Sequence, residues 1–147
     1  MERGVNTVYI PRAAEAAVRK IADTFPVLLV TGPRQVGKTT LLEHLAEPER
    51  KIVTLDDPDV RHLAGNDPAL FLQRYTPPVL IDEIQYAPGL LPYIKMAADR
   101  SGRNGDFWLT GSQSFVMMKN AGESLAGRVG IVRLPGLSTS EILGVPS

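Results

Sequence analysis

Short apolar runs alternate along this chain with longer stretches in which apolar residues recur every three or four positions. Runs rich in Val, Ile and Leu are typical of strands buried in a parallel sheet, and the longer period is typical of helices with one buried face. The pattern predicts strands over residues 27–30, 52–55, 79–81, 106–110 and 128–134. It predicts helices over residues 12–24, 40–45, 69–74 and 90–100, and a short helix over 114–118. We therefore expect an α/β fold: a three-layer arrangement with a parallel sheet between helices, and the carboxyl ends of all strands along one edge.

Capping residues mark where several helices begin and end. Asp57 precedes Pro58 and Asp67 precedes Pro68, and this order fits an N-cap followed by the first helical position. Gly102 follows the predicted 90–100 helix and fits a C-terminal stop. On the buried side of that helix we expect Leu91, Ile94, Met96 and Ala97.

Composition narrows the functional classes. A chain of 147 residues suits one domain, and its 16 basic and 16 acidic residues do not favour nucleic acid or an acidic membrane as partner. Cysteine is absent, which excludes disulfides, thiolate-bound zinc and a thiol nucleophile, and fits a cytoplasmic protein. No apolar run approaches the ~20 residues of a membrane helix, so we expect no membrane partner. The isolated His44 and His62 are better explained as ordinary helix residues than as metal ligands.

Residues 32–39 read Gly-Pro-Arg-Gln-Val-Gly-Lys-Thr and fit the phosphate-binding loop pattern GxxxxGK[ST] between a predicted strand and a predicted helix. Backbone N–H groups of such a loop and the helix dipole favour a bound triphosphate. Lys38 supplies a flexible positive charge for the β- and γ-phosphates, and the Thr39 hydroxyl is a ligand for Mg²⁺. The candidate nucleotide-binding residues are Gly32, Pro33, Arg34, Gln35, Val36, Gly37, Lys38, Thr39 and Thr40.

Two carboxylates end the predicted strand at 79–81. Asp82 is a candidate Mg²⁺ ligand, and Glu83 a candidate base for an attacking water. Ser112, after the next strand, is a candidate sensor of the γ-phosphate, and an ordinary turn explains it almost equally well. Arg128 either neutralises charge during phosphoryl transfer or only begins the last strand. Asp56 and Asp57 also offer carboxylates to a metal, but capping accounts for Asp57 and is the interpretation we prefer.

The final residues predict more chain than is present. Ser138 and Glu141 form a capping-box signature at the start of a helix that has no room to develop before Ser147. We therefore expect a part of a longer protein, with a helical lead-in over residues 1–25, an ATPase core over residues 26–136 and the start of a truncated segment over residues 137–147.

In their joint order these motifs resemble the AAA+ superfamily of ATPases, and more narrowly the bacterial and archaeal ATP-binding proteins whose AAA domain precedes a domain of uncertain role. The matching stretches are residues 9–12 (YIPR), 32–40 (GPRQVGKTT), 55–58 (LDDP), 81–85 (IDEIQ), 109–112 (LTGS) and 123–128 (ESLAGR). The resemblance implies ATP with Mg²⁺, a P-loop NTPase core with strand order 5-1-4-3-2, and Asp82 and Glu83 as the hydrolytic pair. It further implies Ser112 as sensor, and Arg128 at a subunit boundary of a homo-oligomer. The helical lid of the superfamily is missing here, and family members carry a further domain that could hold a DNA or protein client.

Three functions stay open from the sequence. The first is Mg²⁺-dependent ATP binding and hydrolysis that drives a conformational switch. The second is a nucleotide-binding regulatory module with negligible hydrolysis in this truncated form. The third, a small-molecule kinase, is disfavoured because Glu83 offers a water-activating carboxylate and no arginine-rich lid is visible.

Overall fold

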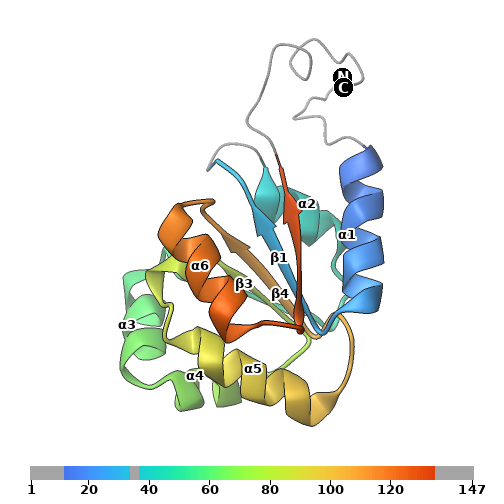
Figure 1. Ribbon diagram of the computed structural model, residues 1–147. Coiled ribbons are helices and arrows are strands. Elements are labelled where there is room, and N and C mark those ends of the chain that lie inside the picture. Colours follow the sequence, from blue (N-terminus) through green and yellow to red (C-terminus); the bar gives the residue numbers. More distant parts are fainter. Residues whose placement is uncertain (1–11, 34–36, 135–147) are drawn as a thin grey trace.

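The structure is a computed structural model that describes residues 12–33 and 37–134 (Figure 1). Its helices are α1 (Arg12–Thr24), α2 (Lys38–Leu45), α3 (Pro58–Asn66), α4 (Pro68–Arg74), the 3₁₀ helix η3 (Ile84–Tyr86), α5 (Leu90–Ser101) and α6 (Phe115–Ser124). Its strands are β1 (Val27–Thr31), β2 (Lys51–Thr54), β3 (Val79–Asp82), β4 (Phe107–Gly111) and β5 (Val129–Arg133). The alternation of apolar runs and helical stretches therefore predicted each of the five strands to within two residues at either end.

The five strands form one sheet in the order β2-β3-β4-β1-β5, with every pairing parallel. Read in reverse this is the order 5-1-4-3-2 that the resemblance implied, so that expectation is confirmed. β1 lies between β4 and β5 and is buried at all five positions. Parallel pairing brings the carboxyl ends of β1, β3 and β4 to one edge, where the predicted site residues follow them.

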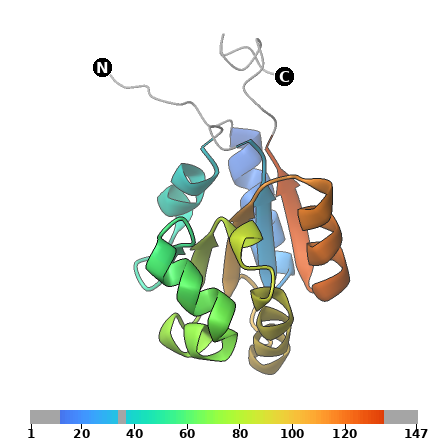
Figure 2. The ribbon, with the colours of Figure 1, turned by 90° about the vertical axis from the view of Figure 1, so that its left-hand side faces the viewer.

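Helices cover both faces of the sheet (Figures 1 and 2). On one face Val18 of α1 and Leu41 and Leu42 of α2 pack against Leu28 and Val30 of β1. On the other face α3 to α6 cover a larger core, to which they contribute Ala64, Phe71, Leu90, Leu91, Ile94, Ala98, Met117 and Ala121. The expected three layers are confirmed, since the central strands β1, β3 and β4 alternate their side chains between the two cores.

Local signals placed the helix ends well. The Asp57 carboxylate accepts from the backbone N–H groups of Asp59 and Val60, and Asp67 accepts from Leu70, each with proline in the first turn. Gly102 ends α5 in the left-handed conformation, at φ 67°. These predictions rest on interactions within a few residues, and all are confirmed.

Two predictions about helices were wrong. Met96 is 51% exposed, because a step of two residues from the buried Ile94 turns about 200° around a helix axis and reaches the opposite face. The helix predicted over residues 114–118 continues as α6 to Ser124, because Met117, Ala121 and Leu125 present a buried stripe four residues apart. Gly122 within this stretch is a poor helix former, and packing on the sheet overrides that preference.

The opposite edge of the sheet is held by a buried arginine. Arg50 donates to the carbonyl oxygens of Val79 (3.1 Å), Gly105 (2.6 Å) and Asp106 (3.2 Å), and its guanidinium lies 3.8 Å from the centre of the Trp108 ring. Burial by itself raises the pKa of its partner Glu47, but hydrogen bonds from Arg50 and the backbone, together with the Arg50 charge, outweigh burial and lower the pKa of that carboxyl. Backbone carbonyls at the amino ends of β3 and β4 are thus satisfied without water.

Candidate nucleotide-binding site

The predicted phosphate loop begins where β1 ends and leads into α2. Gly37 is the N-cap of α2 at φ 85° and ψ 28°, a left-handed conformation that glycine adopts at no steric cost. Gly37 itself has no side chain that could cap the helix start. The positive end of the α2 dipole lies at this point and favours an anion. Arg34, Gln35 and Val36 lie outside the described residues, and Pro33 and Thr40 are exposed at this edge.

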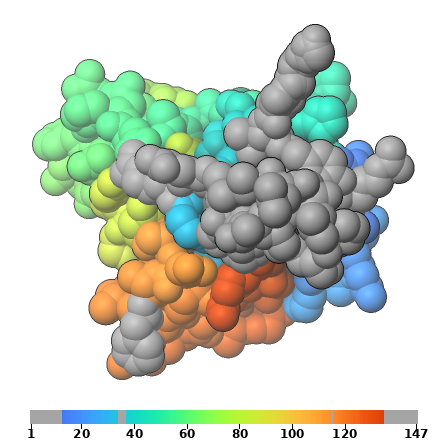
Figure 3. Space-filling model, turned by 90° about the horizontal axis from the view of Figure 1, so that it is seen from above, coloured from blue at the N-terminus to red at the C-terminus, as the bar shows by residue number. Residues whose placement is uncertain are grey.

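Figure 3 views the molecule from this edge, with the α2 and α3 segments on one side and the α6 and β5 segments on the other. Lys38 lies inside it at only 3% exposure. Its Nζ donates to the Gly32 carbonyl oxygen at 2.7 Å and to the Gly111 carbonyl oxygen at 3.2 Å. The ammonium group therefore connects the end of β1 to the end of β4. From this position it would reach a phosphate bound by the loop that follows Gly32.

Asp82 is the last residue of β3 and is surrounded by hydroxyl groups. Its Oδ1 accepts from Thr39 Oγ1 at 2.5 Å and from Thr110 Oγ1 at 2.6 Å, and its Oδ2 accepts from Thr54 Oγ1 at 2.8 Å. The three threonines come from α2, β4 and β2: strand order brings Thr54 and Thr110 to the carboxylate, and the position of α2 at the end of β1 brings Thr39. The predicted metal ligands Thr39 and Asp82, separated by 43 positions in the chain, are in direct contact.

Glu83 follows Asp82 and departs from the strand. Its φ of 63° and ψ of 52° make it the one non-glycine residue at positive φ in the described part of the chain, a conformation that costs about 1–2 kcal/mol. The backbone N–H donates to Thr110 Oγ1 at 2.9 Å, and Oε1 accepts from Gln85 Nε2 at 2.6 Å. The turn keeps the Glu83 side chain beside Asp82 instead of on the opposite face of the sheet, where the next strand residue would point.

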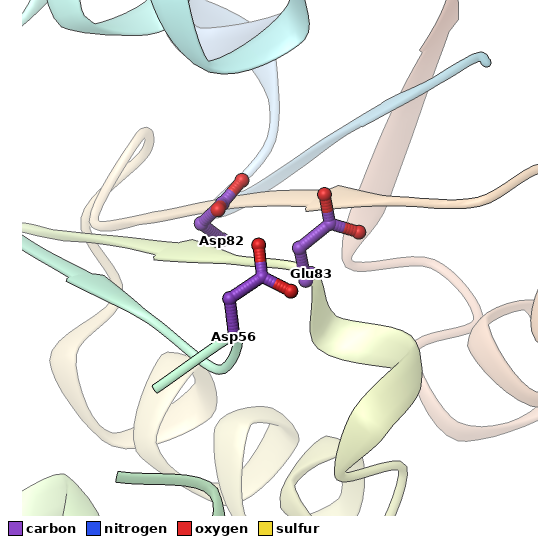
Figure 4. A group of neighbouring side chains, drawn as sticks. All are labelled: Asp56, Asp82 and Glu83. Carbon is purple, nitrogen blue, oxygen red and sulfur yellow. The ribbon is translucent and has the colours of Figure 1, made fainter. Parts of the chain in front are cut away.

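A third carboxylate, from Asp56, completes this group. One oxygen each from Asp56, Asp82 and Glu83 lie within 4.8 Å of one another, with Asp56 exposed and the other two buried. Figure 4 shows the three side chains converging from the ends of β2 and β3. Sequence reasoning offered both Asp56 and Asp57 as carboxylates for a metal and preferred capping for Asp57. For Asp57 the capping interpretation is confirmed, but Asp56 joins the site because β2 is the neighbour of β3, which no local pattern reveals.

Ser112 and Arg128 are placed very differently. Ser112, just beyond β4, donates its backbone N–H to Gln85 Oε1 at 3.1 Å and so belongs to the same edge as Lys38 and Glu83. Arg128 precedes β5, and its carbonyl oxygen accepts from Val27 at the start of β1. It is separated from the phosphate loop of its own chain by the length of β1, about 13 Å.

The Arg128 side chain pairs with Asp99 near the end of α5, through contacts of 2.9 and 3.1 Å. Hydrogen bonding to Arg128 lowers the pKa of the Asp99 carboxyl. The structure therefore does not bring Arg128 to the site of its own chain, and a role toward a neighbouring subunit stays a prediction.

The donor set fits a hard divalent cation. Mg²⁺ prefers oxygen ligands, and this set offers only oxygens: the carboxylates of Asp56, Asp82 and Glu83 and the hydroxyl of Thr39. The set contains no thiol or imidazole group.

Gln85 also belongs to this site, although sequence reasoning quoted it only as part of a matching stretch. Its polar side chain two residues after Glu83 was a signal, but its contacts with two separate strand ends required the fold.

Comparison with known proteins gives one family. The sequence profile of a family described as an AAA domain matches residues 24–143. Two uncharacterized proteins, from Mycobacterium bovis and Mycobacterium tuberculosis, are each 39% identical over 133 residues, which is 89% of this chain and 30% of their length. The chain thus spans about a third of these relatives.

A solved structure titled as that of a DNA replication initiation factor shares the fold. Its TM-score is 0.53 at 16% sequence identity, over 84% of this chain and 44% of that one. No helix in the described ranges has the length and apolarity needed to cross a bilayer. With phosphate loop, acidic strand end and sheet order agreeing with the profile match, the chain belongs to the AAA domain family, within the AAA+ superfamily of P-loop ATPases.

Proposed function

We propose that this domain binds ATP together with Mg²⁺ at the carboxyl edge of its sheet, hydrolyses it, and changes conformation with the state of the nucleotide. The observation that carries the proposal is the contact of Thr39 with Asp82 next to the buried Lys38. A hydroxyl and a carboxylate at the start of a phosphate-binding helix form the oxygen pair that a nucleotide-bound Mg²⁺ requires.

Each residue has a role in this proposal. The backbone of residues 32–40 binds phosphate oxygens, and Lys38 moves its ammonium group onto the β- and γ-phosphates. Thr39 and Asp82 hold Mg²⁺, with Asp56 near enough to act through a water molecule. When bound, Mg²⁺ neutralises charge on the phosphates. Glu83 takes a proton from the attacking water, and Ser112 contacts the γ-phosphate.

Turnover by three variants tests this function. We expect Lys38→Ala to abolish ATP binding, because its ammonium group is the buried cation at the phosphate site. We expect Glu83→Gln to retain binding and lose about 100-fold or more in hydrolysis, because only the base is removed. Lys51→Ala is the matched control, since this lysine lies at the start of β2 and donates to Thr76. Phosphate release that is equal in all four proteins would contradict the proposal.

The second candidate is a nucleotide-binding regulatory module with negligible hydrolysis. The observation in its favour is the 2.6 Å hydrogen bond by which Gln85 occupies Glu83 Oε1. Calorimetry combined with a phosphate assay separates the candidates: measurable MgATP binding without phosphate release favours the regulatory module.

We further propose where the work coupled to ATP is done. The chain corresponds to 30% of the length of the mycobacterial proteins. In this proposal, regions outside this domain do that work, with DNA or a protein as client. In a homo-oligomer Arg128 would reach a neighbour's ATP, and its pair with Asp99 would open to allow this. Arg128→Ala should then lower turnover only under conditions in which the protein assembles.

A further inference from the structure

The peptide group between Gly111 and Ser112 is hydrogen-bonded on both sides. Its carbonyl oxygen accepts from Lys38 Nζ at 3.2 Å, and its N–H donates to Gln85 Oε1 at 3.1 Å. At the other end of the same amide, Gln85 Nε2 donates to Glu83 Oε1 at 2.6 Å. Three hydrogen bonds thus connect the phosphate-site ammonium to the candidate base, through one peptide group and one side-chain amide.

The direction of every bond in this series is determined by chemistry. The Ser112 N–H can only donate and the Glu83 carboxylate accepts, so the Gln85 amide has one orientation that satisfies both. Gly111 lies close to the segment that carries Gln85: a Cβ there would be in tight contact with Ile84 Cγ2, at 3.1 Å, and in van der Waals contact with Gln85 Oε1, at 3.4 Å. The left-handed turn at Glu83 places η3, and with it Gln85, beside the end of β4.

Hydrogen bonds in series polarise one another. A cation at a peptide carbonyl makes the N–H of that peptide a better donor, and an amide whose oxygen accepts becomes a better donor through its nitrogen. The Lys38 charge therefore strengthens the hydrogen bond from Gln85 to Glu83. If bound phosphate oxygens attract the Lys38 ammonium group away from the Gly111 carbonyl, the bonds from Ser112 to Gln85 and from Gln85 to Glu83 weaken.

From this series we infer that Gln85 is a positioning residue through which occupancy of the phosphate site controls the Glu83 carboxylate. Without phosphate, Gln85 holds Glu83 Oε1 and keeps that oxygen from accepting a proton of water. With phosphate on Lys38, the hold relaxes and the carboxylate turns to the water. The inference rests on the proposed function and deepens it, because it makes the position of the Glu83 carboxylate depend on whether phosphate occupies the site.

Nuclear magnetic resonance tests the connection in the protein without nucleotide. Lys38→Met removes the first donor, and we expect it to move the Ser112 amide proton, the Gln85 side-chain amide and the Glu83 carboxyl carbon toward the positions of more weakly bonded groups. Lys38→Gln, which keeps a neutral donor, should give a smaller displacement in the same direction and serves if the methionine variant does not fold. Lys51→Met is the control for a lysine lost elsewhere, and it should move none of the three.

The Gln85→Leu protein separates a connection through the amide from a general disturbance. In that background the Glu83 carboxyl resonance should no longer respond to Lys38→Met, whereas the Ser112 amide still should. Titration of the parent chain with MgATP should reproduce the Lys38→Met displacements. An unmoved Gln85 amide in Lys38→Met, or a Glu83 response that persists without Gln85, overturns the inference even if ATP is hydrolysed normally. Absence of MgATP binding would contradict the proposed function. The comparison of Lys38 variants without nucleotide does not depend on that outcome.

Discussion

At the scale of single residues, Glu83 is both the proposed catalytic base and a residue with an unfavourable backbone conformation. It is the one non-glycine residue at positive φ among those described, and it lies beside Asp82 at the proposed reaction centre. Its backbone is stabilised by Thr110 and its side chain by Gln85, both from neighbouring structure. Unfavourable backbone geometry that surrounding contacts maintain is found most often where function needs it.

This conformation predicts an unusual order of stabilities at position 83. Glu83→Ala and Glu83→Gly both remove the carboxylate and the bond to Gln85, and they differ in the cost of the left-handed backbone. We expect the glycine variant to be more stable than the alanine variant by about 1 kcal/mol, the reverse of their order in ordinary helices. Urea denaturation of the two proteins measures the difference. Equal stabilities, or a more stable alanine variant, would show that the turn is not maintained in solution.

At the scale of elements, α1 crosses β5 at a point where only glycine fits. A Cβ on Gly130 would lie 2.7 Å from Phe25 Cδ2 and closer still to the γ-methyl group of Ile21. The branched Ile21 side chain cannot rotate out of the way without leaving its core position. The close contact of this helix with the edge of the sheet therefore depends on one missing side chain.

Alanine at two glycines should have opposite effects. We expect Gly130→Ala to lower the free energy of unfolding by about 1–3 kcal/mol, because the added methyl group forces α1 away from β5. Gly122→Ala is the control: Gly122 lies in α6 with nothing within 4 Å of its added Cβ, so it should raise the free energy by about 0.5–1 kcal/mol. Chemical denaturation of both variants is the measurement, and a neutral Gly130→Ala would contradict the packing of α1 described above.

At the scale of the whole molecule, the proposed site lies where α2, β2, β3 and β4 meet, so a ligand there links elements from most of the chain. Hydrogen bonds already connect these elements: Asp82 accepts from Thr39, Thr54 and Thr110. Lys38 donates to the carbonyl oxygen at the end of β4. Ligand binding to such a junction should stabilise the domain as a unit, since the unfolded chain offers no comparable site.

Thermal unfolding in the presence of nucleotide measures how much ligand binding stabilises the domain. At an ATP concentration of about 100 times Kd with Mg²⁺ present, we expect about 2.7 kcal/mol of added stability and a rise in Tm of roughly 5–10 °C. Removal of Mg²⁺ with a chelator should reduce the rise, because Asp82 and the phosphates then repel each other. Lys38→Ala should show no rise at all. A rise that is indifferent to both changes would place the nucleotide elsewhere on the protein.

Interactions between near neighbours in the chain account for what could be read in advance: the strands, the aspartate caps before Pro58 and Pro68, and the phosphate loop pattern. The strand order came with the family resemblance, not with any local pattern. The sequence did not reveal that Asp56 would join Asp82 and Glu83, that Gln85 would contact Ser112, or that Arg128 would pair with Asp99. Those contacts join residues from separate strands and helices, and they exist only after the apolar faces have packed, because burial of those faces determines which strand lies beside which.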